Sequence, residues 1–266
     1  MHKTHPRVSI VIPAHNEEGR LRACLESIAA QTSRPYEVIV VDNNSTDTTT
    51  AIAASFPFVR IVSEAQQGIV FARNAGFDAA TGDIIGRIDA DVTMPSNWVA
   101  HIQAFYADAA HWRQAWSGAG FFYNIPLPRL MSWGYAFLAF RLNVVLSGSS
   151  TLWGSNMAIT REQWLAVRQG VHLRTDIHED LDLSLHIADG GYTIIYDSRL
   201  KTRAELRRVM SERGKLWGYV QWWPNTLRAH RKHTWILCWL ISVMVLYPGL
   251  YTLVVLDALA RAMGRR

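Results

Sequence analysis

Short runs of β-branched residues alternate with longer segments of helical period along the first third of the chain. Four runs have the buried, β-branched character of strands in a parallel sheet: residues 8–13, 36–42, 58–63 and 83–89. The segments between them carry apolar residues at the spacing of one helix face, as at Leu21, Cys24, Leu25 and Ile28. Four strands joined by three helices predict a βαβ series and therefore an α/β domain with a mostly parallel sheet.

Polar side chains follow three of these strands at the point where each strand ends. In open sheets of this type, ligands bind beyond the carboxyl ends of the strands. The residues there are His15, Asn16 and Glu17 after the first strand, Asp42, Asn43 and Asn44 after the second, and Asp89 and Asp91 after the fourth. We therefore expect the ligand site at this edge of the sheet.

Two phosphate-binding motifs are missing from the sequence. It contains no GxxxxGK[ST] loop, and its first strand-to-helix turn, PAHNEEG, lacks the GxGxxG pattern of dinucleotide-binding folds. A nucleotide bound here must therefore have its phosphates neutralised in another way. Asp89 and Asp91 can offer oxygen ligands to Mg²⁺ or Mn²⁺, which bridges the oxygens of a diphosphate. The alternative is that both are ordinary turn residues before Met94 and Pro95, since so short a motif often occurs without a metal.

Five blocks of sequence, in this order, resemble the family-2 glycosyltransferases with the GT-A fold: VSIVIPAHNEE, YEVIVVDNNSTDTT, QGIVFARNAGFDAATGDIIGRIDAD, WGSNMAITREQW and HEDLDLSLHIADGGY. The resemblance implies a nucleotide-sugar donor (UDP- or GDP-linked), a divalent cation and inversion at the anomeric carbon. It also assigns site residues. Pro13, His15, Glu17 and Asp42 would hold the base and ribose, Arg73 would lie near the donor, and Asp89 and Asp91 would serve the nucleotide and the metal.

The chemistry of sugar transfer also asks for a general base. Displacing a nucleoside diphosphate builds negative charge on the leaving group, which a metal stabilises, but a sugar hydroxyl attacks poorly until a base takes its proton. The resemblance points to the Glu-Asp pair Glu179 and Asp180, with Asp180 as the base. The alternative is that Glu179, Asp180 and Asp182 only complement the dipole at the start of a helix.

The resemblance divides the chain into a catalytic domain, residues 1–202, with a nucleotide-sugar half of about 1–95 and an acceptor half of about 96–202. Within the acceptor half, residues 147–151 and Gly154 predict a flexible loop near the acceptor. His172, His178 and His186 lack the fixed spacing of a metal-binding motif, so we expect ordinary surface or core histidines.

Beyond the catalytic domain the composition points to a membrane. Residues 203–233 mix basic and aromatic side chains, which predicts an amphipathic helix at a bilayer surface or a helix packed on the catalytic domain. In the last segment, 234–266, residues 235–256 carry no charge and would span about 33 Å as a helix. Because Pro248 and Gly249 interrupt this stretch and both flanks are basic, a single span and a re-entrant hairpin both remain open.

Charge and composition also bear on partners and location. The chain has a formal charge of +5, but it is 49% hydrophobic with 11 tryptophans, which is not the profile of a purely electrostatic nucleic-acid binder. Its two cysteines form no disulfide framework, and no secretory leader precedes the first strand. We therefore expect no nucleic-acid partner and a location at the cell membrane, with the catalytic domain on the cytoplasmic side.

Three functions are compatible with the sequence. The first is a membrane-attached inverting glycosyltransferase that uses metal-assisted single displacement on a hydroxyl acceptor, a lipid or lipid-linked glycan. The second is a polyprenyl-phosphate glycosyl synthase, whose anionic acceptor needs no base, so that loss of the Asp180 carboxylate would be tolerated. The third is a non-catalytic nucleotide-sugar-binding scaffold at the membrane.

Overall fold

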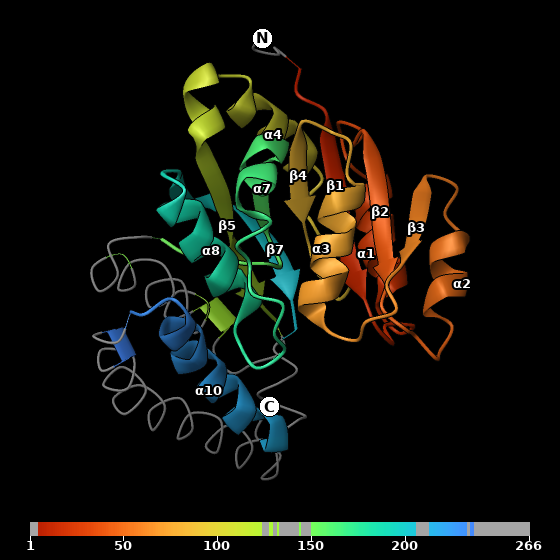
Figure 1. Cartoon of the computed structure of the whole chain (residues 1–266). Coiled ribbons are helices and arrows are strands. Elements are labelled where there is room, and N and C mark those ends of the chain that lie inside the picture. Colours follow the sequence, from red (N-terminus) through yellow and green to blue (C-terminus); the bar gives the residue numbers. More distant parts are fainter. Residues whose placement is uncertain are drawn as a thin grey trace.

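The computed structural model describes residues 5–123, 128–129, 132, 144, 150–205, 213–232 and 235–236 of the chain. Within these residues a seven-stranded sheet has the strand order β3-β2-β1-β4-β6-β5-β7 (Figure 1). The strands are β1 (Val8–Ala14), β2 (Glu37–Asp42), β3 (Val59–Ser63), β4 (Ile84–Arg87), β5 (Gln114–Phe122), β6 (Met157–Thr160) and β7 (Thr193–Ala204).

Most neighbouring strands run parallel. The pairs β1–β2, β2–β3, β1–β4 and β5–β7 are parallel, and only β6 runs against its neighbours β4 and β5. This confirms the predicted α/β class with a mostly parallel sheet. The reversed strand β6 joins the part of the sheet built from the first four strands to the part built from β5 and β7.

Helices cover both faces of the sheet. In the described residues the helices are α1 (Leu21–Ala29), α2 (Thr49–Ala54), α3 (Ile69–Ala79), α4 (Trp98–Tyr106), the 3-10 helix η1 (Ala109–Arg113), α7 (Arg161–Val167), α8 (Glu179–Asp189) and α10 (Arg213–Ala229), of which six pack on the sheet. One hydrophobic core joins α1, α2 and α4 to the sheet, and a second joins α3, α7 and α8 to its opposite face. Figure 1 looks onto the face covered by α3, α7 and α8.

The side chains of β1 alternate between the two faces of the sheet, which explains why helices cover both faces. Every residue of this central strand is buried, and successive side chains point to opposite faces. Ile10 and Ile12 pack in the first core, whereas Val11 between them packs in the second. Helix α3 lies close against the sheet at Gly76, because a Cβ there would collide with the side chains of Val11 and Val41.

The predicted element boundaries need small corrections. The predicted fourth strand, 83–89, ends at Arg87, so Asp89 lies in the following loop. Strand β5, Gln114–Phe122, lies beyond the four predicted strands, and its residues Ala115 and Trp116 are buried in the sheet. Strand β7 runs to Ala204, two residues beyond the expected end of the catalytic domain at 202.

The C-terminal predictions are only partly covered by the structure. Helix α10 falls inside the predicted region 203–233, and its end packs on α8 through Leu227, which contacts Leu181 and Leu185. This contact favours packing on the catalytic domain for that end of the helix. The predicted membrane segment, 234–266, lies outside the described residues except for Trp235 and Ile236. In the described part of the chain, no helix combines the length and apolar character needed to cross a bilayer.

Candidate active site

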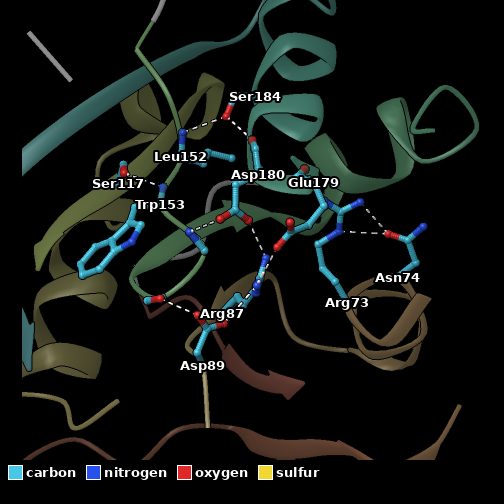
Figure 2. A network of polar contacts seen from close by, with 12 residues as sticks. Arg73, Asn74, Arg87, Asp89, Ser117, Leu152, Trp153, Glu179, Asp180 and Ser184 are labelled. Carbon is cyan, nitrogen blue, oxygen red and sulfur yellow. Dashed lines mark hydrogen bonds and ion pairs between the residues drawn. The ribbon is translucent and has the colours of Figure 1, made fainter. Parts of the chain in front are cut away.

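A buried arginine joins the acidic residues that lie far apart in the sequence. Arg87, at the end of β4, is 2% exposed and contacts three carboxylates. Its Nη1 donates to Oδ1 of Asp180 at 2.6 Å, and its Nη2 donates to Oδ1 of Asp89 at 3.0 Å and to Oε1 of Glu179 at 3.1 Å. Figure 2 shows the guanidinium group between Asp89 on one side and the Glu179-Asp180 pair on the other. The structure therefore places the two predicted acidic motifs in one site.

The start of α8 is held by the segment that precedes β6. The backbone N–H of Gly154 donates to Oδ2 of Asp180 at 2.9 Å. One turn further along α8, the Ser184 hydroxyl donates to the carbonyl of Asp180 and accepts from the backbone N–H of Leu152 at 2.8 Å (Figure 2). Both oxygens of the Asp180 carboxylate therefore have a fixed donor, and the side chain is held in one orientation.

Gly154 was predicted to lie in a flexible loop, but it is buried and hydrogen-bonded. A Cβ at this position would come within 2.5 Å of both Asp180 carboxylate oxygens and 2.6 Å of Nη1 of Arg87. Only a glycine leaves room for the ion pair. The next residue, Ser155, donates its hydroxyl proton to Oδ2 of Asp89, so this segment touches both acidic motifs. Its neighbour Asn156 is anchored in the sheet through Nδ2, which donates to the carbonyl of Ala119 at 2.9 Å.

Burial and charge separate the proton affinities of the acidic pair. Burial raises the pKa of Asp180, and the negative charge of Glu179 raises it further, although Arg87 opposes both effects. For Glu179 burial also acts to raise the pKa, but the charges of Arg87, His178 and Arg73 and a backbone hydrogen bond together outweigh it and lower the value from 4.5 to about 2. The pair therefore combines a carboxylate that stays ionised with one that binds a proton more readily, which is the property of a general base.

Arg73 is fully buried beneath this pair. Its Nη1 donates to the backbone carbonyl of Glu179 at 2.7 Å, and its Nε and Nη2 donate to Oδ1 of Asn74 (Figure 2). The structure therefore places Arg73 against the first residue of α8. Its predicted position near the donor stays a prediction, and its observed contact is with the acidic pair.

The other predicted donor-binding residues lie in the loops after β1 and β2. Pro13 is buried in β1, and Nδ1 of the exposed His15 lies 2.8 Å from the carbonyl of Asn43. The N–H of Glu17 donates to the Thr49 hydroxyl at 2.7 Å, so the first loop is joined to the start of α2. Asp42 ends β2 and accepts from the N–H of Ser45 through Oδ1 at 3.2 Å. These contacts bring the two loops together, but the nucleotide roles of these residues stay predictions.

Asp91 borders a separate cavity next to the Asp89 loop. The cavity has a volume of 170 Å³ and is lined by Gly19, Arg20, Ala23, Cys24, Asp91, Thr93, Tyr123, Arg203 and Glu205. Burial raises the pKa of the Cys24 thiol, and the negative charges of Asp91, Asp89 and Glu17 raise it further. Several carboxylates thus lie near this thiol. Such oxygen donors fit a hard divalent cation, so Asp91 and Asp89 are suitable ligands for Mg²⁺ or Mn²⁺.

Comparison with known proteins identifies the family. The model of glycosyl transferase family 2 matches residues 9–163, which is more than half of the 266-residue chain. This chain belongs to glycosyl transferase family 2. The matched region includes β1 to β6 and therefore Arg87, Asp89 and Gly154, while the Glu179-Asp180 pair lies after it.

Curated relatives share only part of their length with this family-2 chain. The glycosyltransferase AglE of Haloferax volcanii is 36% identical over 106 residues, which are 37% of this chain and 35% of that protein. The PGL/p-HBAD biosynthesis glycosyltransferase of Mycobacterium bovis is 37% identical over 109 residues, or 39% of this chain and 43% of that protein. In these two comparisons the chain therefore matches less than half of the relative.

Solved structures show the same fold over a larger part of the chain. The mannosyltransferase PcManGT of Pyrobaculum calidifontis, solved with GDP-Man and Mn²⁺, superposes with a TM-score of 0.61 at 22% identity and covers 96% of this chain and 81% of that one. The S. aureus protein TarS superposes with a TM-score of 0.57 at 16% identity, covering 76% of this chain and 37% of that chain. These similarities confirm the GT-A fold.

Sequence reasoning missed Arg87, which is the centre of the site. A basic residue two positions before Asp89 was visible in the sequence, and a charged residue at the end of a buried strand needs a partner. Its partners at positions 179 and 180 are more than 90 residues away, so the spacing gave no sign of the contact.

Proposed function

We propose that this chain is an inverting glycosyltransferase, which moves a sugar from a nucleotide-sugar donor to a hydroxyl acceptor by a single displacement. The observation that carries the proposal is the Arg87 contact. It holds Asp89, a proposed ligand of the donor and metal, next to Asp180, the candidate base. A donor bound at Asp89 and an acceptor hydroxyl activated at Asp180 would meet at this point. Neighbours of the same fold solved with UDP-GlcNAc or with GDP-Man and Mn²⁺ support the donor class.

Asp180 is the proposed base that takes the proton of the acceptor hydroxyl. Its two carboxylate oxygens accept from Arg87 and from the N–H of Gly154, and each oxygen retains a second lone pair for the hydroxyl proton. The raised pKa of Asp180 increases its affinity for that proton. Arg87 then stabilises the site by keeping the neighbouring Glu179 ionised and in place.

Asp91 and Asp89 are the proposed ligands of Mg²⁺ or Mn²⁺. A divalent cation bound there would supply positive charge to the diphosphate of the leaving group. Asp89 is oriented for this role by Arg87 on one oxygen and by the Ser155 hydroxyl on the other. Asp91 contributes a second carboxylate from the wall of the neighbouring cavity.

We further propose that the enzyme acts at the cytoplasmic side of the cell membrane on a lipid or lipid-linked glycan. Residues 235–256 are uncharged, and Arg228, Arg231 and Lys232 precede them, which supports attachment to a membrane with anionic lipid headgroups. Because α10 packs on α8, this attachment would hold the acidic pair close to the bilayer, where a lipid acceptor is presented.

A screen of nucleotide sugars tests the proposal. A donor present at about 100 times its Kd stabilises the native state by about 2.7 kcal/mol. This corresponds to a rise in Tm of roughly 5 °C or more for a chain of this size. We expect one UDP- or GDP-sugar to give this shift in the presence of Mn²⁺ and to be hydrolysed slowly without acceptor. The Asp91→Ala variant should lose the Mn²⁺-dependent part of both signals. If no nucleotide sugar shifts Tm with Mn²⁺ present, the proposal is wrong.

A further inference from the structure

A second polar cluster lies further along α8, beyond the acidic pair. Three histidine ring nitrogens converge on Oδ1 of Asp182. Nδ1 of His172 lies at 2.6 Å, Nε2 of His230 at 2.8 Å and Nε2 of His186 at 3.5 Å from this oxygen. The ligand-type atoms of the four side chains all lie within 4.8 Å of one another. Three imidazoles and one carboxylate therefore surround a single point.

Hydrogen bonding alone does not satisfy this cluster. The Asp182 side chain is 0% exposed and that of His230 is 4% exposed, so water reaches these groups poorly. Oδ2 of Asp182 already accepts from the backbone N–H of His172 at 3.0 Å. Oδ1 has two lone pairs for three ring nitrogens. The nitrogen that is left over is Nε2 of His186, which is buried and, at 3.5 Å from Oδ1, is the farthest of the three from the carboxylate.

We propose that His172, Asp182, His186 and His230 form a binding site for Zn²⁺ or a similar transition-metal ion. Three imidazole nitrogens and one carboxylate oxygen are a ligand set that suits Zn²⁺ rather than Mg²⁺. In a tetrahedral site with metal–ligand distances of about 2.0–2.1 Å, the ligand atoms lie about 3.3 Å from one another. The observed distances to Oδ1 of Asp182, 2.6 to 3.5 Å, differ from this value by less than 1 Å. Small side-chain rotations would admit the ion.

The surroundings of two histidines also fit metal binding. Nδ1 of His230, the nitrogen that points away from the cluster, lies 4.0 Å from Oδ2 of Asp189. In metal sites a carboxylate commonly accepts a hydrogen bond from the outer nitrogen of a ligating imidazole; Asp189 lies near that position, although 4.0 Å is longer than a hydrogen bond. The ring of His186 lies against Gly170, where a Cβ would come within 3.1 Å of Nδ1. The glycine therefore leaves space for the ring to turn its Nε2 toward the cluster.

The site would join three separate parts of the chain. His172 lies in the connection between α7 and α8, Asp182 and His186 lie on α8, and His230 directly follows α10. A bound ion would fix α10 against α8, whose first two residues are Glu179 and Asp180. The ion thus has a structural, positioning role, and it is distinct from the cation proposed at Asp91 and Asp89.

The spacing of these residues explains why the sequence did not reveal the site. His172, His186 and His230 lie 10, 4 and 48 residues from Asp182. Only the pair Asp182 and His186 shares a helix face at a spacing that the sequence displays. The expectation that His172 and His186 are ordinary surface or core histidines is therefore replaced by this proposal.

Cobalt titration tests the site without relying on enzyme activity. The full chain is purified in detergent, stripped of metal with a chelator and titrated with Co²⁺, which absorbs visible light strongly when it is bound tetrahedrally. We expect one equivalent to bind with the tetrahedral spectrum, and Zn²⁺ to displace it. His230→Gln should weaken Co²⁺ binding by more than about 100-fold, since even the loss of an outer-shell partner weakens metal binding by about 10–100-fold. His172→Gln, at the most exposed ligand, gives the same test if the first variant does not fold.

Two controls separate this site from other histidines and from the proposed catalytic cation. His101→Gln removes a histidine that also contacts a carboxylate, Asp197 at 3.0 Å, and should bind Co²⁺ as the wild type does. Asp91→Ala should retain the tetrahedral Co²⁺ spectrum even though it loses Mn²⁺-dependent donor binding. If Co²⁺ does not bind, or binds equally well to His230→Gln and His172→Gln, the cluster is only a hydrogen-bonded carboxylate and the proposal is overturned.

Discussion

Replacing Arg87 by methionine removes the positive charge that holds the active site together. Methionine has a similar length but no charge, so Glu179 and Asp180 would stay buried without their main counter-ion. Removing one partner of a buried ion pair costs about 3–5 kcal/mol of stability. The pKa of Glu179 is lowered from 4.5 to about 2, which corresponds to about 3 kcal/mol, and Arg87 is the largest of the charges that lower it. We therefore expect Arg87→Met to lower the free energy of unfolding by about 3–5 kcal/mol at pH 7.

The dependence of this loss on pH tests its electrostatic origin. The folded-state pKa of Glu179 is depressed, so its stabilisation is fully present above 4.5 and is lost as the pH falls toward about 2. In the variant the buried carboxylates bind protons at a higher pH, which relieves the uncompensated charge. The difference between wild type and variant should therefore be largest near neutral pH and become smaller as the pH falls below about 5.

Urea-induced unfolding in detergent measures both quantities. Trp98, Trp116 and Trp164 are fully buried, so tryptophan fluorescence follows the loss of the two cores. Arg174→Met is a matched control, because its partner Asp176 is half exposed and the pair should contribute only about 0–1 kcal/mol. The reasoning is refuted if Arg87→Met costs no more than this control, or if its cost does not decrease with decreasing pH.

Three further predictions concern catalysis. Asp180→Asn should abolish sugar transfer while nucleotide binding, measured by calorimetry, stays nearly intact; transfer at the wild-type rate would show that Asp180 is not the base. Gly154→Ala should lower kcat by about 100-fold, because its Cβ would displace the Asp180 carboxylate from Arg87 and a misplacement of about 1 Å has an effect of this size. Gly190→Ala, whose Cβ comes no closer than 3.3 Å to a neighbour, is the control, and equal kcat values would contradict the steric argument. In wild type, kcat/KM should fall as the pH falls through the pKa of Asp180. Burial and the charge of Glu179 raise this pKa above 3.8. If kcat/KM falls only at or below pH 3.8, Asp180 is not the base.

Much of the fold was accessible from the sequence because it depends on local patterns. Continuous β-branched runs such as that of β1 need cover on both faces, and the apolar stripe of α1 supplies part of it. Since parallel strands end at one edge, the sequence also placed Asp42, Asp89 and Asp91 at the carboxyl edge of the sheet, where ligands of such folds bind. The family resemblance added the Glu179-Asp180 pair.

The reversal of β6 and the position of β7 next to β5 were not accessible in this way. They depend on which strands pair, and no local periodicity specifies a pairing partner. The role of Gly154 was equally hidden, because its small size matters only where Arg87 and Asp180 meet.

The sequence by itself determined which residues carry charge and near which strand or helix most of them lie, because burial and periodicity act over a few neighbouring residues. Only the tertiary structure decided which of these charges meet. Arg87 reaches Asp180 across 93 positions, and His230 reaches Asp182 across 48. Such contacts arise when helices pack on a common sheet, so their energies depend on distance and burial in space, which separation along the chain does not encode.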